Sequence, residues 1–188
     1  EPVRVRIIAI TADRALCGSY AANILKKVAE TLRTVGPDGG PLAPENARIL
    51  VVGRKGQAFF RRRSYPVVGE YGMNMTGATF AEAQEVARHA RDLYTSGEID
   101  VLYLVYTRFL SALTQRPTMV QVLPMGTDGD AAEAGASEDY LFEPDASTLL
   151  GQMLPRSVDT LVYQALLESI ASEHGARMTA MSSATDNA

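Results

Sequence analysis

Residues 155–188, PRSVDTLVYQALLESIASEHGARMTAMSSATDNA, form the stretch that decides the fold. In its first half, apolar residues recur at three- and four-residue spacing, which predicts a helix with one apolar stripe lying on a core. These residues are Val158, Leu161, Val162, Ala165, Leu166 and Ile170. The stripe then changes to small or flexible side chains that bury little area but let a second helix approach closely. These are Ala171, Ala176, Met178, Ala180, Met181 and Ala184. We therefore expect a helix that begins on a globular domain and continues towards a partner helix.

Two further expectations concern the course of this helix. Pro155 lacks the N–H that would bond to the carbonyl of Gly151, so a kink or break is expected between these two residues. Order is expected over Val158 to Ile170, with progressive fraying beyond Gly175, a residue that costs a helix about 1 kcal/mol relative to alanine and would act as a hinge. Because the last four residues contain neither glycine nor proline, we interpret the helix as cut.

Ahead of this helix, apolar strands alternate with amphipathic helices. Strands are predicted at Val3–Ile10, Arg48–Gly53, Pro66–Glu70, Ile99–Thr107 and Thr118–Leu123. Helices are predicted from Ser19 to Gly36, from Arg54 through Phe60, and from Thr79 to Gly97, where Thr79 and Glu82 have the spacing of a capping box. The residues that the last of these helices is expected to bury are Phe80, Ala83, Val86, Ala87, Ala90, Leu93 and Tyr94.

This order of elements predicts an α/β fold: a Rossmann-like three-layer domain with a mostly parallel sheet, followed by a long C-terminal helix that is half of a coiled coil. The globular domain is assigned to residues 1–145 and the helical segment to residues 146–188. Within the domain, GPDGGPLAPEN (36–46) is expected to be a surface loop without regular structure. MGTDGDAAEAGASED (125–139) is expected to be a mobile excursion, because it is acidic and has little to bury.

Composition and charge narrow the function. A net charge of −4 over 188 residues argues against a nucleic-acid binder, and the run Arg61-Arg62-Arg63 is best interpreted as a solvated helix end. The single cysteine excludes an internal disulfide and fits a reducing compartment. No apolar run approaches the ~20 residues that span a bilayer, so direct bilayer insertion is not expected.

Residues able to carry chemistry are few. The turn TADRALCGS (11–19), with Gly18 and Ser19, and the turn from Gly53 to Gly56 each offer a weak phosphate-site pattern. Cys17 would need an activating histidine to act as a nucleophile, and neither His89 nor His174 is obviously beside it. No zinc constellation, metal site, cofactor or catalytic residue emerges. One alternative nevertheless stays open, a small α/β enzyme that binds a nucleotide or phosphate at the two glycine turns.

Several segments of the chain, taken in order, indicate a subunit of a larger assembly instead. The segment from Leu166, LLESIASEHGARMTAMSSATDNA, is similar to the start of the long C-terminal helix of the gamma subunit of F-type ATP synthases. Shorter segments resemble the same family in the same order. They are TADRALCGS from Thr11, GRKG from Gly53, YTRF from Tyr106, Leu123-Pro124 and DYLFEPD from Asp139.

The resemblance implies a central rotor stalk subunit that couples rotation of a proton-driven membrane ring to ATP synthesis or hydrolysis on other subunits. It implies a non-catalytic role, with the alpha and beta subunits, the epsilon subunit and the membrane c-ring as partners. It also implies a peripheral position on the cytoplasmic face of a bacterial plasma membrane.

Site residues follow from the same resemblance. Asp13, Arg14 and Cys17 would contact an acidic lever segment of the beta subunit, with Arg14 making the attractive contact. Tyr140, Phe142 and Glu143 would contact the membrane ring, and the neighbouring sheet edge would meet epsilon. Ile170, Met178 and Met181 would pack the shaft.

Overall fold

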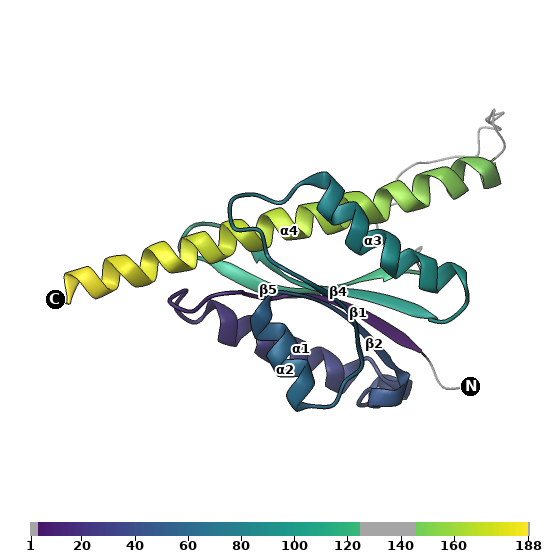
Figure 1. Cartoon of the computed structure of the whole chain (residues 1–188), viewed down its shortest axis with the longest axis horizontal. Helices are drawn as coiled ribbons and strands as arrows, with labels where there is room; N and C mark the ends of the chain where they lie inside the picture. The colour runs from purple at the N-terminus through teal and green to yellow at the C-terminus, as the bar shows by residue number, and fades with distance from the viewer. Residues whose placement is uncertain (1–3, 125–145, 188) are drawn as a thin grey trace, which may run out of the picture.

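The computed structural model describes residues 4–124 and 146–187, which form one mixed sheet covered by helices on both faces (Figure 1). The strand order is β3-β2-β1-β4-β5. The strands are β1 (Val5–Ile10), β2 (Ala47–Val52), β3 (Val67–Tyr71), β4 (Val101–Phe109) and β5 (Gln115–Leu123). The first four are parallel and β5 is antiparallel to β4, so the expected mostly parallel sheet is confirmed.

Strand β5 is antiparallel because no helix separates it from β4. The chain reverses in a tight turn in which Leu110 N–H donates to Thr114 O at 3.2 Å and Thr114 N–H donates to Ser111 O at 3.2 Å. Parallel neighbours need a crossover of a dozen or more residues, whereas a short turn can join only antiparallel strands. The strand expected from Thr118 therefore begins earlier, at Gln115, as the second half of a hairpin.

The helices form the two outer layers. Helices α1 (Tyr20–Thr34) and α2 (Arg54–Arg62) cover one face, and α3 (Phe80–Thr95) and α4 (Ala146–Asp186) cover the other. Strand β1 is central and fully buried, so its alternate residues serve the two cores: Ile7 faces α1, and Ile8 faces α3 and α4. Three layers around a buried central strand confirm the predicted fold class.

Local signals were largely, but not wholly, correct. The capping box of α3 is present, with Glu82 N–H donating to Thr79 Oγ1 at 3.2 Å and Thr79 N–H donating to Glu82 Oε2 at 2.7 Å. The predicted burial of Phe80 was wrong. Its ring is exposed at the first turn of α3 and meets Tyr163 edge-on, with centroids 5.4 Å apart. The loop 36–46, expected to lack regular structure, contains two 3₁₀ turns, Pro37–Gly39 and Pro44–Asn46.

Helix α4 passes Pro155 without a break, so the predicted break is absent. The lost backbone hydrogen bond is offset by packing on α3, since Val158 is buried just after the proline. Polar contacts add to it: Arg91 and Asp159 form an ion pair at 3.1 Å, and Gln84 Nε2 donates to Asp159 Oδ2 at 3.3 Å. The expected excursion 125–139 lies outside the described residues.

Candidate functional site at the carboxyl edge of the sheet

The carboxyl edge of the parallel strands is where open α/β sheets usually bind ligands, in the crevice where the strand order reverses. Here the strand order reverses between β1 and β4, and helix α4 packs on the face of the sheet against both strands (Figure 1). Thr107 N–H donates to Ser169 Oγ at 3.4 Å, and Ser172 Oγ donates to Thr107 O at 3.4 Å. From the other layer, Tyr20 Oη donates to Ser169 O at 3.3 Å. The chain's own helix therefore occupies the position where the strand order reverses.

Tyr20 ties helix α1 to this crossing point. Burial raises the pKa of its phenol. The phenol is therefore neutral at physiological pH and is available as a donor to the backbone of α4. Because Tyr20 belongs to the α1 layer and Ser169 to α4, this bond joins the two helical layers across the edge of the sheet.

The loop between β1 and α1 packs against α4. Arg177 Nη1 donates to Ala15 O at 3.0 Å. A Cβ at Gly18 would lie 3.7 Å from Ala176 O and from Ala180 Cβ, so the loop lies close to the helix. The side chain of Cys17, which belongs to this loop, is buried. Its Sγ donates to Arg14 O at 3.6 Å. The structure thus places Cys17 as a packing residue, away from either histidine's contacts.

Asp13 holds three segments together at this edge. Its Oδ1 accepts from Arg54 N–H at 2.9 Å, at the start of α2, and its Oδ2 accepts from Met73 N–H at 3.2 Å, in the loop after β3. Both carboxylate oxygens therefore serve internal hydrogen bonds. Of the three residues expected to contact the beta subunit, only Arg14 presents an exposed side chain.

The turn from Gly53 to Gly56 packs closely against neighbouring backbone, and its amides form hydrogen bonds within the domain. A Cβ at Gly53 would lie 2.8 Å from Thr11 Oγ1, so glycine is needed for close approach. Gly56 N–H donates to Thr11 Oγ1 at 3.0 Å, and Lys55 N–H donates to Ala12 O at 2.9 Å. With Arg54 N–H bonded to Asp13, the first amides of α2 already have partners. The phosphate-binding alternative is therefore not favoured.

A buried ion pair on α4 escaped sequence reasoning. Glu173 is 0% exposed, and Arg177 Nη2 donates to its Oε1, one helical turn away. The spacing of four residues is visible in the sequence, but such pairs usually lie on a solvated face. Here the carboxylate is buried, and the Arg177 guanidinium that pairs with it also bonds to Ala15 O in the 11–19 loop.

Gly175 was also misjudged. It is buried, and a Cβ there would lie 2.9 Å from Ala112 O in the β4–β5 hairpin. Beside it, His174 Nε2 donates to Met75 O at 2.9 Å. The helix therefore touches two loops at the position interpreted as a hinge, and these contacts argue against that interpretation. Contacts with the domain continue as far as Ala180.

The residues expected to pack the shaft divide into two kinds. Ile170 is buried in the core shared by the sheet, α3 and α4. Met178 and Met181 are 60% and 47% exposed. The C-terminal end of α4 extends past the sheet (Figure 1). Tyr140, Phe142 and Glu143, the residues expected to contact the membrane ring, lie outside the described residues.

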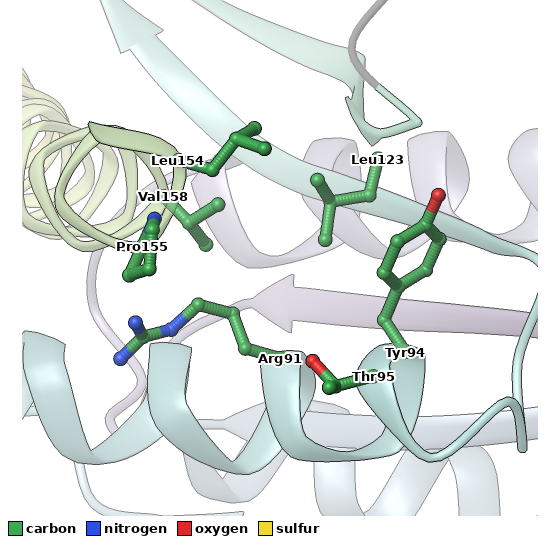
Figure 2. Close-up of a pocket in the computed structure, with 7 residues that line it drawn as sticks. All are labelled: Arg91, Tyr94, Thr95, Leu123, Leu154, Pro155 and Val158. Atoms are coloured by element: carbon green, nitrogen blue, oxygen red, sulfur yellow. The ribbon is translucent and has the colours of Figure 1, made fainter. Parts of the chain in front are cut away.

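A cavity of about 210 Å³ lies between α3, α4 and the end of β5 (Figure 2). Tyr94, Leu123, Leu154 and Val158 make most of its lining apolar. The guanidinium of Arg91 is paired with Asp159, and the volume is below the roughly 300–1,000 Å³ of typical ligand sites. The cavity is a packing gap beside Pro155.

Residues 4–124 and 146–187 contain no group of three or more His, Cys, Asp or Glu side chains that could hold a metal ion. Within the same residues, no helix has the length and apolar character needed to cross a membrane.

The sequence of the chain is similar to those of known proteins over its whole length. The chain matches the family described as ATP synthase over residues 1–188. It is 41% identical to the ATP synthase gamma chain of Desulforamulus reducens and 42% identical to that of Moorella thermoacetica, in each case covering 100% of this chain and 63% of the relative. The chain thus spans about 63% of the length of these relatives.

Solved structures share the fold. A chain of the Tetrahymena thermophila mitochondrial ATP synthase central stalk and c-ring aligns with a TM-score of 0.70 at 24% identity, covering 98% of this chain and 78% of that one. A chain of the Euglena gracilis mitochondrial ATP synthase rotor aligns with a TM-score of 0.68 at 19% identity, covering 99% and 68%.

Proposed function

Because the chain belongs to the ATP synthase gamma-chain family, we propose that it acts in the central rotor stalk of a proton-translocating F-type ATP synthase. The resemblance drawn from the sequence is confirmed at the level of the family. In this role the chain carries torque between a membrane ring and catalytic sites that lie on other subunits. It contributes no catalytic group of its own.

The observation that supports this most directly is the course of α4. The helix occupies the position where other open α/β sheets bind ligands, and beyond Ile170 its exposed face carries Met178 and Met181. Exposed methionines at helical spacing suit a second helix packed alongside. Residues 1–145 would then be the foot and residues 146–188 the first part of the shaft, anchored on the foot through Ile170.

The proposed partners are the alpha and beta subunits, the epsilon subunit and the c-ring, with the chain on the cytoplasmic face of a bacterial plasma membrane. Asp13 and Cys17 are engaged within the domain. Arg14 is therefore the residue proposed to reach an acidic segment of beta. Tyr140, Phe142 and Glu143 remain the proposed ring contact.

A chimaeric gamma chain tests this function. Residues 1–188 would replace the aligned segment of the Desulforamulus reducens gamma chain, and the product would be reconstituted with that organism's other subunits. We expect ATP hydrolysis and ATP-driven proton pumping to be retained. A second chimaera carrying Met178→Asp and Met181→Asp should lose pumping more than hydrolysis. Both residues are exposed, so the isolated chain should keep its thermal midpoint.

The enzyme alternative has its own test. Isothermal titration of the isolated chain with ATP and ADP should give no binding heat, because the α2 amides and the crevice are occupied. Tight nucleotide binding that disappears on altering Gly53 or Gly56, together with a chimaera that fails to assemble, would overturn the proposed function.

A further inference from the structure

We propose that Glu173 and Arg177 form a latch that positions residues 14–18 on helix α4. The latch is defined by two contacts of one guanidinium: Nη2 donates to Glu173 Oε1 and Nη1 donates to Ala15 O at 3.0 Å. The link to torque transfer rests on the proposed function, whereas the latch itself is a property of this chain.

The burial of Glu173 shows that the pair is more than a surface ion pair. The carboxylate is 0% exposed, and its Oε2 has no hydrogen-bond partner among the described residues. A buried ion pair is weak evidence for stability, because apolar residues of similar volume often serve as well. Its geometry is the more useful property here, since the carboxylate fixes the orientation of the Arg177 fork.

Arginine suits this position in a way that lysine does not. The guanidinium is a rigid planar fork whose nitrogens bond two acceptors at once, whereas lysine offers a single ammonium on a flexible stem. One nitrogen meets the carboxylate on the same helix and another meets a carbonyl on the loop. The side chain of Arg177 therefore links the two segments directly.

The loop needs such a link because its backbone is unfavourable locally. Leu16 has a φ of 63°, in the left-handed region that non-glycine residues rarely adopt, and its side chain is exposed. Gly18 has a φ of 58° and packs on the backbone of α4 at Ala176. Contacts with α4 hold this conformation, so releasing Arg177 should let residues 14–18 move away from the helix.

The latch would also transmit force between the contact loop and helix α4. Arg14, the proposed contact with a partner subunit, immediately precedes Ala15. A load on Arg14 would reach α4 through Ala15 O, Arg177 and Glu173, without passing through the sheet. The contact loop and the emerging helix would then move as one unit.

Cys17 provides the assay, because it is the chain's single cysteine and is buried under the loop. The rate at which a thiol reagent such as DTNB labels the folded chain reports opening of residues 14–18. Variants Glu173→Gln and Arg177→Lys would be compared with Glu30→Gln, which removes the same charge from the exposed Lys27–Glu30 pair. Labelling would be measured at several low urea concentrations. Local opening exposes little surface, so its labelling rate changes little with urea, whereas the rate of labelling through global unfolding rises steeply.

We expect Glu173→Gln and Arg177→Lys to label roughly 10- to 100-fold faster than the parent, the range for losing one hydrogen bond to a charged group. The increase in labelling rate should be the same at each low urea concentration, and Glu30→Gln should label at the rate of the parent. If Glu173→Gln does not fold, Arg177→Lys alone decides, since it keeps the positive charge beside Glu173.

Two results would overturn the proposal. One is unchanged labelling in the folded variants. The other is an increase in labelling rate that rises with urea as steeply as amide exchange at Ile8, a buried residue of the central strand. That result would show that the variants only destabilise the whole domain. Neither result bears on rotor assembly, which the chimaera tests separately.

Discussion

Replacing Gly175 by alanine sets two effects of opposite sign against each other. In an open helical position, alanine is more favourable than glycine by about 1 kcal/mol. At Gly175 the added Cβ would lie 2.9 Å from Ala112 O and 3.2 Å from Ala112 Cα. Both are backbone atoms, so relief requires the hairpin to move away from α4. Overpacking of this kind costs roughly 1–3 kcal/mol.

The sum predicts that Gly175→Ala lowers the free energy of unfolding by about 1 kcal/mol, within a range of about 0 to 2. Urea unfolding followed by circular dichroism would measure it. Gln164, which is exposed on the same helix, calibrates the helix term: Gln164→Ala should be more stable than Gln164→Gly by about 1 kcal/mol. If Gly175→Ala is instead stabilised by the amount separating the two Gln164 variants, the helix is not pressed against the hairpin and the hinge interpretation returns.

Three further outcomes are expected. Ile170→Ala should lower the free energy of unfolding by roughly 2–5 kcal/mol, whereas exposed Met178→Ala should change it by less than about 0.5 kcal/mol; similar losses would contradict the burial of Ile170 and the exposure of Met178. Thr79→Ala should cost about 1 kcal/mol by removing the cap of α3, and an unchanged urea midpoint would exclude that role. The pKa of His89 is lowered from 6.5, first by burial and then by Arg6, so its stabilising contribution is present above pH 6.5 and declines as pH falls through the lowered pKa. Chemical denaturation between pH 7 and 5 should show this decline, and His89→Gln should flatten it unless other groups cause it.

The sequence allowed the layers and their order to be predicted because hydrophobic periodicity is a local property. The strand at β1 and the capping box at Thr79 are each encoded in fewer than about ten neighbouring residues. Pro155 was misjudged because the cost of a proline is local, whereas the packing of Val158 on α3 that offsets it comes from residues far away in the chain.

The site was harder to predict for the same reason. Glu173, Gly175 and Asp13 owe their roles to loops that approach them from distant parts of the sequence. Family resemblance drew attention to Asp13, Arg14 and Cys17 as contact residues, but it could not show that two of them are engaged inside the domain. A glycine within a helix indicates either flexibility or close approach, and only the position of Ala112 decides between them.

The passage of α4 through the crevice makes the helix, in effect, a tethered ligand of its own sheet. A free ligand occupies its site according to its concentration, whereas a tethered one acts at a fixed effective concentration, of millimolar order for short flexible linkers. Occupancy of this crevice is therefore insensitive to dilution and to cellular metabolite levels. A peptide of the docked α4 sequence should displace the helix only when its own concentration approaches the effective one. Binding energy that other α/β domains direct towards a small molecule here holds one end of a helix against rotation.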